Sequence, residues 1–168
     1  MMRVVGTALL ASGGACIGFH AAAELSHCVR TLEELGTSLA LLEQELELGG
    51  CDLKACFRTV AGRSGGEVGN FFSACAEGMD SLEKTPFPAL WARLCGELPI
   101  GAEGQRILSA LGNTLGRCET DRQRQALAAV RGQLDRLAGE YRGELRRRGR
   151  VFQAVGVSAG AFLAILLL

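Results

Sequence analysis

Residues 25–46 read LSHCVRTLEELGTSLALLEQEL, and this stretch decides the fold. Its apolar residues return every three or four positions, which is the spacing of one side of an α-helix. They are Leu25, Val29, Leu32, Leu35, Leu39, Leu42 and Leu46. Acidic residues, among them Glu43, Glu45 and Glu47, are expected on the solvated sides. The stretch therefore predicts an amphipathic helix that ends at Gly49-Gly50 and packs its leucines against other helices.

The remainder of the central block predicts further helices and no strands, because no segment alternates apolar and polar residues over strand length. Asp52 is expected to cap a short helix. Ser64 and Glu67 have the spacing of a capping box, which would open a helix ending near Lys84. The segment KTPFP interrupts the chain before the next helix. The expected helices cover residues 53–62, 64–84, 88–98, 102–115 and 120 onward.

Short connections between these helices predict an all-α fold, an antiparallel bundle of about six helices. The expected core draws on each helix in turn. Its members after the first helix are Val68, Phe71, Phe72, Cys75, Met79, Leu90, Trp91, Leu94, Leu98, Ile107, Leu108, Leu111 and Leu115.

Both ends of the chain are strongly apolar. Residues 2–23 contain one charge, Arg3, and residues 151–168 contain none. Segments of this length and composition are typical of membrane spans. The expected organisation is a transmembrane helix over 1–23, a helical bundle over 24–150 and a second transmembrane helix over 151–168.

Charge is divided unevenly along the chain, although its total is balanced at 18 basic and 18 acidic residues. Residues 21–103 hold 13 acids and 6 bases, a net of −7, and residues 104–150 hold 5 acids and 11 bases, a net of +6. The balance argues against nucleic acid as a partner. Arginines beside a span stay in the cytosol and attract anionic lipids, so the bundle is expected to be cytosolic. The arginines expected at the membrane surface are Arg142, Arg146, Arg147, Arg148 and Arg150.

A cleaved signal peptide is the alternative for the first segment, since small residues near Ala21–Ala23 follow an apolar run. Export would place the arginine cluster on the wrong side of the second apolar segment and expose the cysteines to oxidation. The seven cysteines are odd in number and form no CxxC pair, which favours buried apolar thiols over disulfides.

Residues 111–125, LGNTLGRCETDRQRQ, resemble a phosphate loop only superficially. Three residues separate Gly112 from Gly116, whereas a phosphate loop needs four, and Arg follows in place of Lys. Gly116 suits the residue after a helix, and Thr120 with Gln123 suits the start of the next one. The stretch predicts a corner between helices.

No catalytic, cofactor or metal site is expected. Cys16, His20 and His27 share one helical face, but His20 and His27 lie about 10 Å apart along the axis at 1.5 Å per residue. Only Cys16 and His20 could share one ion, and two ligands are too few for structural zinc. No nucleophile is paired with a base in the sequence.

Two glycine pairs of the GxxxG type lie in the apolar ends. They are Gly14 with Gly18 and Gly156 with Gly160. Each pair lies 6 and 10 residues from the nearest charged flank, Glu24 or Arg150. Small residues let membrane helices approach closely, so the two spans are expected to pack on each other or between subunits of a homo-oligomer.

In order along the chain, several features resemble the stage III sporulation protein AB family of endospore-forming bacteria. They are Gly18-Phe19 before the first helix, LALLEQEL at 39–46, Trp91 in a central helix, the two LG pairs at 111–116 followed by an acid and Gln123, and a Gly-rich last span. The chain departs from the family in having Cys118-Glu119 where many members have Asp, and in its high cysteine content.

The resemblance implies a non-enzymatic subunit of a secretion-like channel complex in the mother-cell membrane around the forespore. It also implies a fold similar to the cytosolic domains of type II secretion platform proteins. The implied partners are other proteins of the stage III sporulation A complex, especially the secretion ATPase-like protein AA. The polar residues of the corner are the candidate partner surface: Arg117, Glu119, Asp121 and Arg122. An enzyme, a metal-binding membrane protein and a pore-forming subunit are the alternatives.

Overall fold

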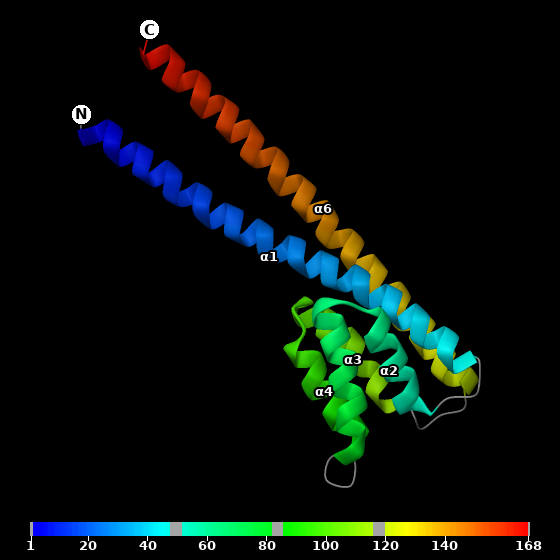
Figure 1. The fold of residues 1–168 in the computed structure, drawn as a ribbon. Helices are drawn as coiled ribbons and strands as arrows, with labels where there is room; N and C mark the ends of the chain where they lie inside the picture. Colours follow the sequence, from blue (N-terminus) through cyan, green and yellow to red (C-terminus); the bar gives the residue numbers. More distant parts are fainter. Residues whose placement is uncertain (1, 48–51, 82–85, 116–119, 168) are drawn as a thin grey trace. The chain divides into compact units, whose positions relative to one another are not determined.

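The structure, a computed structural model, describes residues 2–47, 52–81, 86–115 and 120–167 (Figure 1). All regular secondary structure in these ranges is helical, which confirms the all-α prediction. The elements are α1 (Met2–Glu47), α2 (Leu53–Arg63), α3 (Gly66–Gly78), the 3₁₀ helix η1 (Met79–Ser81), α4 (Phe87–Glu97), α5 (Gly101–Ser109), the 3₁₀ helix η2 (Ala110–Asn113) and α6 (Thr120–Leu167).

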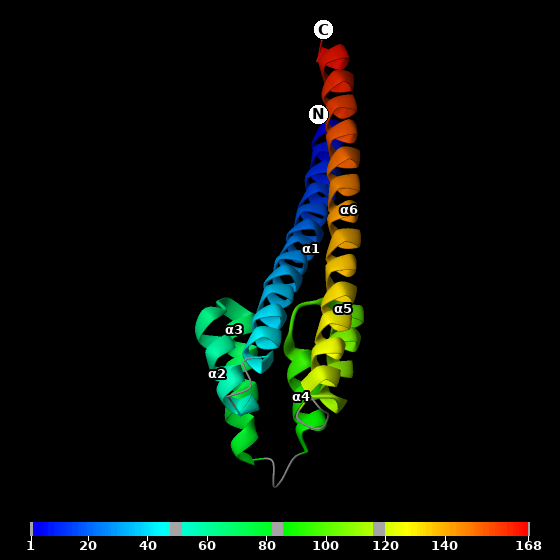
Figure 2. The same ribbon diagram turned by 90° about the vertical axis from the view of Figure 1, so that its right-hand side faces the viewer.

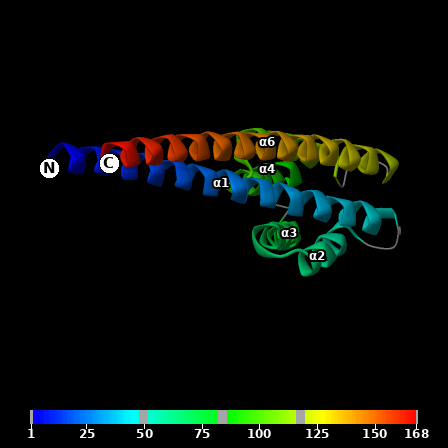
Figure 3. The ribbon, with the colours of Figure 1, turned by 90° about the horizontal axis from the view of Figure 1, so that it is seen from above.

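The chain divides into two compact units. The terminal unit contains Met1–His27 and Gly139–Leu168, and the core unit contains Cys28–Ala138. Helices α1 and α6 belong to both units, because each continues without a break from one into the other. Within the terminal unit the two helices run in opposite directions (Figures 2 and 3).

Most of the leucine stripe of α1 lies in the core unit and is buried as predicted, whereas Leu25, which lies in the terminal unit, and Leu46 are only half-buried. Leu32, Leu35, Leu39 and Leu42 have no solvent exposure. Leu127 and Leu134 of α6 are buried in the same unit. Two ion pairs and the close approach of Gly36 to Asp135 join α1 to α6 there; a Cβ added at Gly36 would lie 3.1 Å from the Asp135 Oδ1 atom. The stripe is thus the apolar side of the predicted amphipathic helix.

An aromatic cluster fills the middle of the core unit. Trp91 is fully buried, and its ring centroid lies 5.0 Å from that of Phe71 and 6.0 Å from that of Phe57. The Trp91 Nε1 group donates a hydrogen bond of 2.9 Å to the carbonyl oxygen of Leu108. This bond satisfies the polar end of a large buried side chain, as buried indoles require. The cluster therefore ties α2, α3, α4 and α5 together.

The predicted capping box at Ser64 is wrong. The residue before α3 is Gly65, and Gly66 begins the helix with a φ of +54°, a conformation that favours glycine. Ser64 follows the end of α2, and its hydroxyl lies 2.7 Å from that of the nearly buried Ser38 on α1. The Ser64 side chain therefore contacts Ser38 of α1 instead of capping α3.

Two predicted helices end earlier than expected. Helix α3 stops at Gly78 and tightens into η1, instead of continuing toward residue 84. Helix α5 stops at Ser109 and tightens into η2, where Gly112 approaches Trp91 closely. Leu111 and Leu115 are nevertheless buried, as predicted. Asp52 precedes α2 as expected, but its side chain makes no capping hydrogen bond.

Candidate functional site

The predicted partner surface at the corner is only partly described. Asp121 and Arg122 are exposed in the first turn of α6. Arg117 and Glu119 lie outside the described residues, as does Gly116. Helix α6 begins at Thr120, close to the predicted start. The structure therefore places two of the four candidate residues at an accessible helix end.

The predicted membrane-surface arginines lie along α6. Arg142, Arg146 and Arg147 are exposed. The side chains of Arg148 and Arg150 are outside the described part of the structure. Arg146 and Arg147 follow Arg142 by four and five residues, so the three side chains point in different directions around the helix and cover a broad face. This spread suits contact with a surface better than a single bound ion.

The predicted packing glycines lie in the helical ends of α1 and α6. Gly14, Gly18, Gly156 and Gly160 are helical, but their surroundings lie outside what the structure describes. Within the described ranges, no helix has both the length and the apolar character that crossing a membrane requires. Packing at these four glycines stays a prediction.

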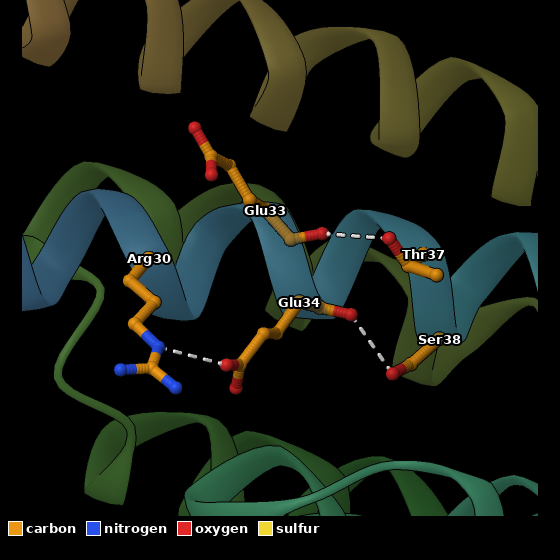
Figure 4. A network of polar contacts seen from close by, with 5 residues as sticks. All are labelled: Arg30, Glu33, Glu34, Thr37 and Ser38. Carbon is orange, nitrogen blue, oxygen red and sulfur yellow. Dashed lines mark hydrogen bonds and ion pairs between the residues drawn. The ribbon is translucent and has the colours of Figure 1, made fainter.

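The polar side of α1 is tied up in local bonds (Figure 4). The Arg30 Nε group donates to Glu34 Oε1 at 3.1 Å. The Thr37 and Ser38 hydroxyls donate to the carbonyl oxygens of Glu33 and Glu34 at 3.1 and 2.9 Å. The bonds of the two hydroxyls satisfy these polar groups without adding to helix stability, and the Ser38 hydroxyl also lies within hydrogen-bond distance of Ser64.

Three acids of α1 were expected to form a solvated face. The structure corrects this for Glu43 and Glu45, which are half-buried, whereas Glu47 is exposed. Glu43 accepts from Arg131 of α6 at 3.0 Å, Glu45 lies 3.8 Å from Arg63 of α2, and Glu47 pairs with Arg124 of α6. The Glu45 side chain is only 14% exposed. These carboxylates therefore join α1 to neighbouring helices. Sequence reasoning missed the pairs because their partners lie far along the chain.

Described residues of the core unit line two surface hollows, and neither hollow was predicted. A hollow of about 270 Å³ lies between α3 and the end of α4, lined by Glu67, Asn70, Phe71, Ala74, Leu94, Glu97 and Leu98. A more polar hollow of about 360 Å³ lies at the corner between α2 and α3, lined by Arg58, Ala61, Gly62, Ser64, Gly66, Gly69, Asn70 and Ser73. Helical spacing could have placed the α3 members of the first hollow on one side of that helix, because they are three or four residues apart, but it could not have placed α4 beside them.

The four thiols of the core unit that the structure describes are buried, as predicted: Cys28, Cys56, Cys75 and Cys95. Burial raises the pKa of Cys75 far above its usual range and raises that of Cys95 to about 12. A protonated, buried thiol is a poor nucleophile and a poor metal ligand. His20 is exposed and lies 3.8 Å from Glu24. In the described ranges no three His, Cys, Asp or Glu residues lie close enough to hold a metal.

The family model for Stage III sporulation protein AB matches residues 3–168. The chain belongs to this family. The match covers the terminal helices as well as the core unit, and it confirms the resemblance inferred from the sequence. No curated protein and no solved structure matches the chain. Membership of the stage III sporulation protein AB family indicates a role in sporulation.

Two of the residues that carried the resemblance to the stage III sporulation protein AB family meet in the core unit. A Cβ added at Gly112 would lie 2.9 Å from Trp91 Cδ1 and 3.2 Å from Trp91 Cγ. The φ angle of Gly112 is not positive, so the backbone conformation does not require glycine there. Glycine is required because a side chain would collide with Trp91. The first LG pair and the central tryptophan are thus two sides of one packing contact.

Proposed function

We propose that this member of the stage III sporulation protein AB family is a membrane-anchored scaffold subunit of a secretion-like channel complex. In this proposal the complex lies in the mother-cell membrane around the forespore and is required for endospore formation. The chain acts by binding proteins and lipids and catalyses no reaction. Its partners are other proteins of the stage III sporulation A complex, above all an AA-type secretion ATPase.

The observation that carries the proposal is the continuity of α1 and α6. Each helix passes unbroken from a terminal stretch with almost no charge into the core unit. A scaffold subunit needs a folded unit joined to an anchor, and this chain makes that connection twice.

The arginines of α6 support the membrane part of the proposal. Arg142, Arg146 and Arg147 are exposed and lie shortly before the uncharged residues 151–168 in sequence. Basic residues in this position contribute roughly 1 kcal/mol each to attraction by anionic lipids. They also favour a cytosolic core unit with both termini on the opposite side of the membrane.

The scaffold role is tested by deleting the gene in a sporulating host and supplying tagged variants of the full chain. Wild-type chain should restore heat-resistant spores and should retain the AA-type ATPase in pull-downs from sporulating cells. Asp121→Lys with Arg122→Glu, at the exposed start of α6, should weaken retention. Gln133→Glu, which alters the charge at another exposed position of α6, is the control. Normal spore numbers in the deletion strain would refute the proposal.

Topology is tested separately by protease access. Added protease should leave the core unit intact in right-side-out vesicles and cut it in inverted ones. Cleavage of the core unit in right-side-out vesicles would contradict the cytosolic assignment and would favour export of this unit.

A further inference from the structure

Helix α6 contains four glycines at which a side chain would meet only open space. A Cβ atom added at Gly132, Gly139, Gly143 or Gly149 would meet nothing within 4 Å, whereas one added at Gly112 would collide with a neighbour. The four glycines of α6 are exposed and lie inside the helix, and none has a positive φ. Neither packing nor backbone conformation therefore requires glycine there. Glycine is the poorest helix former after proline, so these residues weaken α6.

Three of these glycines lie together, within residues 139–149, at the point where α6 leaves the core unit. The boundary between the two units falls between Ala138 and Gly139. In the described stretch from Gly139 to Arg147 no side chain is buried. Most helical stability in proteins comes from the packing of an apolar face, so residues 139–149 depend on their own preference for the helix. Before the boundary, α6 is held by buried side chains: Leu127, Val130, Leu134, Leu137 and Ala138.

Helix α1 leaves the core unit without this weakness. Its residues 20–27 belong to the terminal unit, and none of them is buried. They read HAAAELSH, with three alanines in a row and no glycine. Alanine is the strongest helix former. Both helices therefore lose their buried contacts where they leave the core unit, but only α6 has residues there that disfavour the helix.

We propose that α6 opens locally over residues 139–149, while α1 and the part of α6 in the core unit stay helical. The opening would break helical hydrogen bonds around three glycines. It would leave the core packing in place, because the buried residues of α6 end at Ala138. Segments with few buried contacts can unfold independently of the rest of a protein. Of the two helices that join the units, α6 is the one that yields.

Close packing of a second helix against the glycines is the alternative explanation, because small residues let helices approach each other. That explanation needs a partner helix, whereas the weak helix preference of glycine needs none. The two explanations also predict opposite effects of alanine. Alanine stabilises α6 if the segment opens, and it obstructs the approach if a second helix packs there.

Hydrogen–deuterium exchange of the full chain in lipid nanodiscs, measured by mass spectrometry, tests the local opening. Backbone amides of residues 139–149 should exchange faster than those of residues 20–27, after correction for their intrinsic rates. Gly139→Ala combined with Gly143→Ala should slow exchange over residues 139–149 roughly 15- to 30-fold, because each alanine favours the helix roughly four- to fivefold. The inference goes beyond the scaffold role and does not depend on it, so its failure would leave that role untouched.

Two controls separate local opening from other causes. Gly132→Ala makes the same substitution where α6 has buried neighbours, and it should leave exchange over residues 139–149 unchanged. Ala23→Gly places a glycine at an exposed position of α1. It should speed exchange over residues 20–27 roughly four- to fivefold.

Wild-type exchange over residues 139–149 that is as slow as exchange over residues 20–27 would overturn the inference. An equal slowing by Gly132→Ala would also overturn it, since the segment would then open only when the whole core unit unfolds. Unchanged exchange in the double-alanine variant would show that the glycines do not set the stability of the segment, and the inference would be wrong. Faster exchange in that variant, with a smaller particle in size-exclusion chromatography, would replace the opening by a packing surface for a second helix.

Discussion

Gly112→Ala should destabilise the core unit, because the added methyl group meets a side chain that has no room to move. The Cβ would lie 2.9 Å from Trp91 Cδ1, whereas carbon atoms in contact prefer about 3.5–4.0 Å. Relief requires a shift of roughly 0.5 Å or more. The indole is held on its other sides by Phe57, Phe71 and Phe87.

The same shift would strain the hydrogen bond of Trp91. The Nε1 group lies 2.9 Å from the carbonyl oxygen of Leu108, and a further 0.5 Å would exceed the usual limit of about 3.2 Å. A lost hydrogen bond contributes about 1 kcal/mol, and overpacking of a core costs about 1–3 kcal/mol in total. We therefore expect Gly112→Ala to lower the free energy of unfolding by about 1–3 kcal/mol.

Gly132→Ala is the matched control. A Cβ at Gly132 meets no atom within 4 Å, and the residue lies inside α6. Exchange of glycine for alanine in an exposed helix interior stabilises by about 1 kcal/mol. Exchange of glycine for alanine should therefore lower the free energy of unfolding at position 112 and raise it at position 132.

Urea unfolding of the full chain in detergent measures both effects. Trp91 is the only tryptophan, so its fluorescence reports on the site itself, and circular dichroism reports on the helices. Repeating Gly112→Ala in a Trp91→Leu background should reduce its effect by about 1 kcal/mol or more, because the colliding ring is absent. A neutral Gly112→Ala, or an equal effect in both backgrounds, would refute the reasoning.

Three further outcomes are expected. Glu43→Arg should lower the free energy of unfolding by up to about 1 kcal/mol, since Glu43 and Arg131 join α1 to α6 at 3.0 Å. The double variant Glu43→Arg with Arg131→Glu should recover part of this loss in urea unfolding. No recovery would show that the ion pair does not contribute to stability. Hydrogen bonds from Lys54 and Arg106 lower the pKa values of Asp80 and Glu103 respectively. Both carboxylates therefore stabilise the folded state at a pH above their unfolded pKa values, and this stabilisation is lost as the pH falls below about 4. Acid titration should show a smaller loss of folding stability in Asp80→Asn than in the wild type. At pH 8 iodoacetamide should leave Cys75 and Cys95 unmodified in the native chain, because at a pKa of about 12 only roughly one Cys95 thiol in ten thousand is ionised. Peptide mass spectrometry measures the labelling, with the exposed cysteine of Ala92→Cys as the control. Rapid labelling of Cys75 or Cys95 in the native chain would contradict the prediction.

Features set by short-range periodicity could be predicted from the sequence. The stripe from Leu32 to Leu42 determines one face of α1, and the helix around Trp91 follows from its spacing and from the prolines before it. The burial of Leu111 and Leu115 follows in the same way. The helical fold and the family resemblance both rest on such local patterns.

Features set by tertiary partners could not be predicted. The Ser64 hydroxyl has the spacing for a cap but meets Ser38, which lies 26 residues earlier. The acids Glu43 and Glu45 look like a solvated face until Arg131 and Arg63 are brought beside them. The hollow needs the relative position of α3 and α4, which no pattern within either helix contains.

The packing of α1 on α6 has a consequence for synthesis of the chain. Glu43 and Arg131 are separated by 88 residues, so α1 emerges from the ribosome long before its partner. At about 5–20 residues per second this wait lasts roughly 4–18 s. Throughout that interval the leucines of α1 have no α6 to cover them, although α2 to α5 can already gather around Trp91. The last helix to be made is therefore the one that closes the core unit, and a ribosome that stalls before it leaves the apolar face of the first helix incompletely covered.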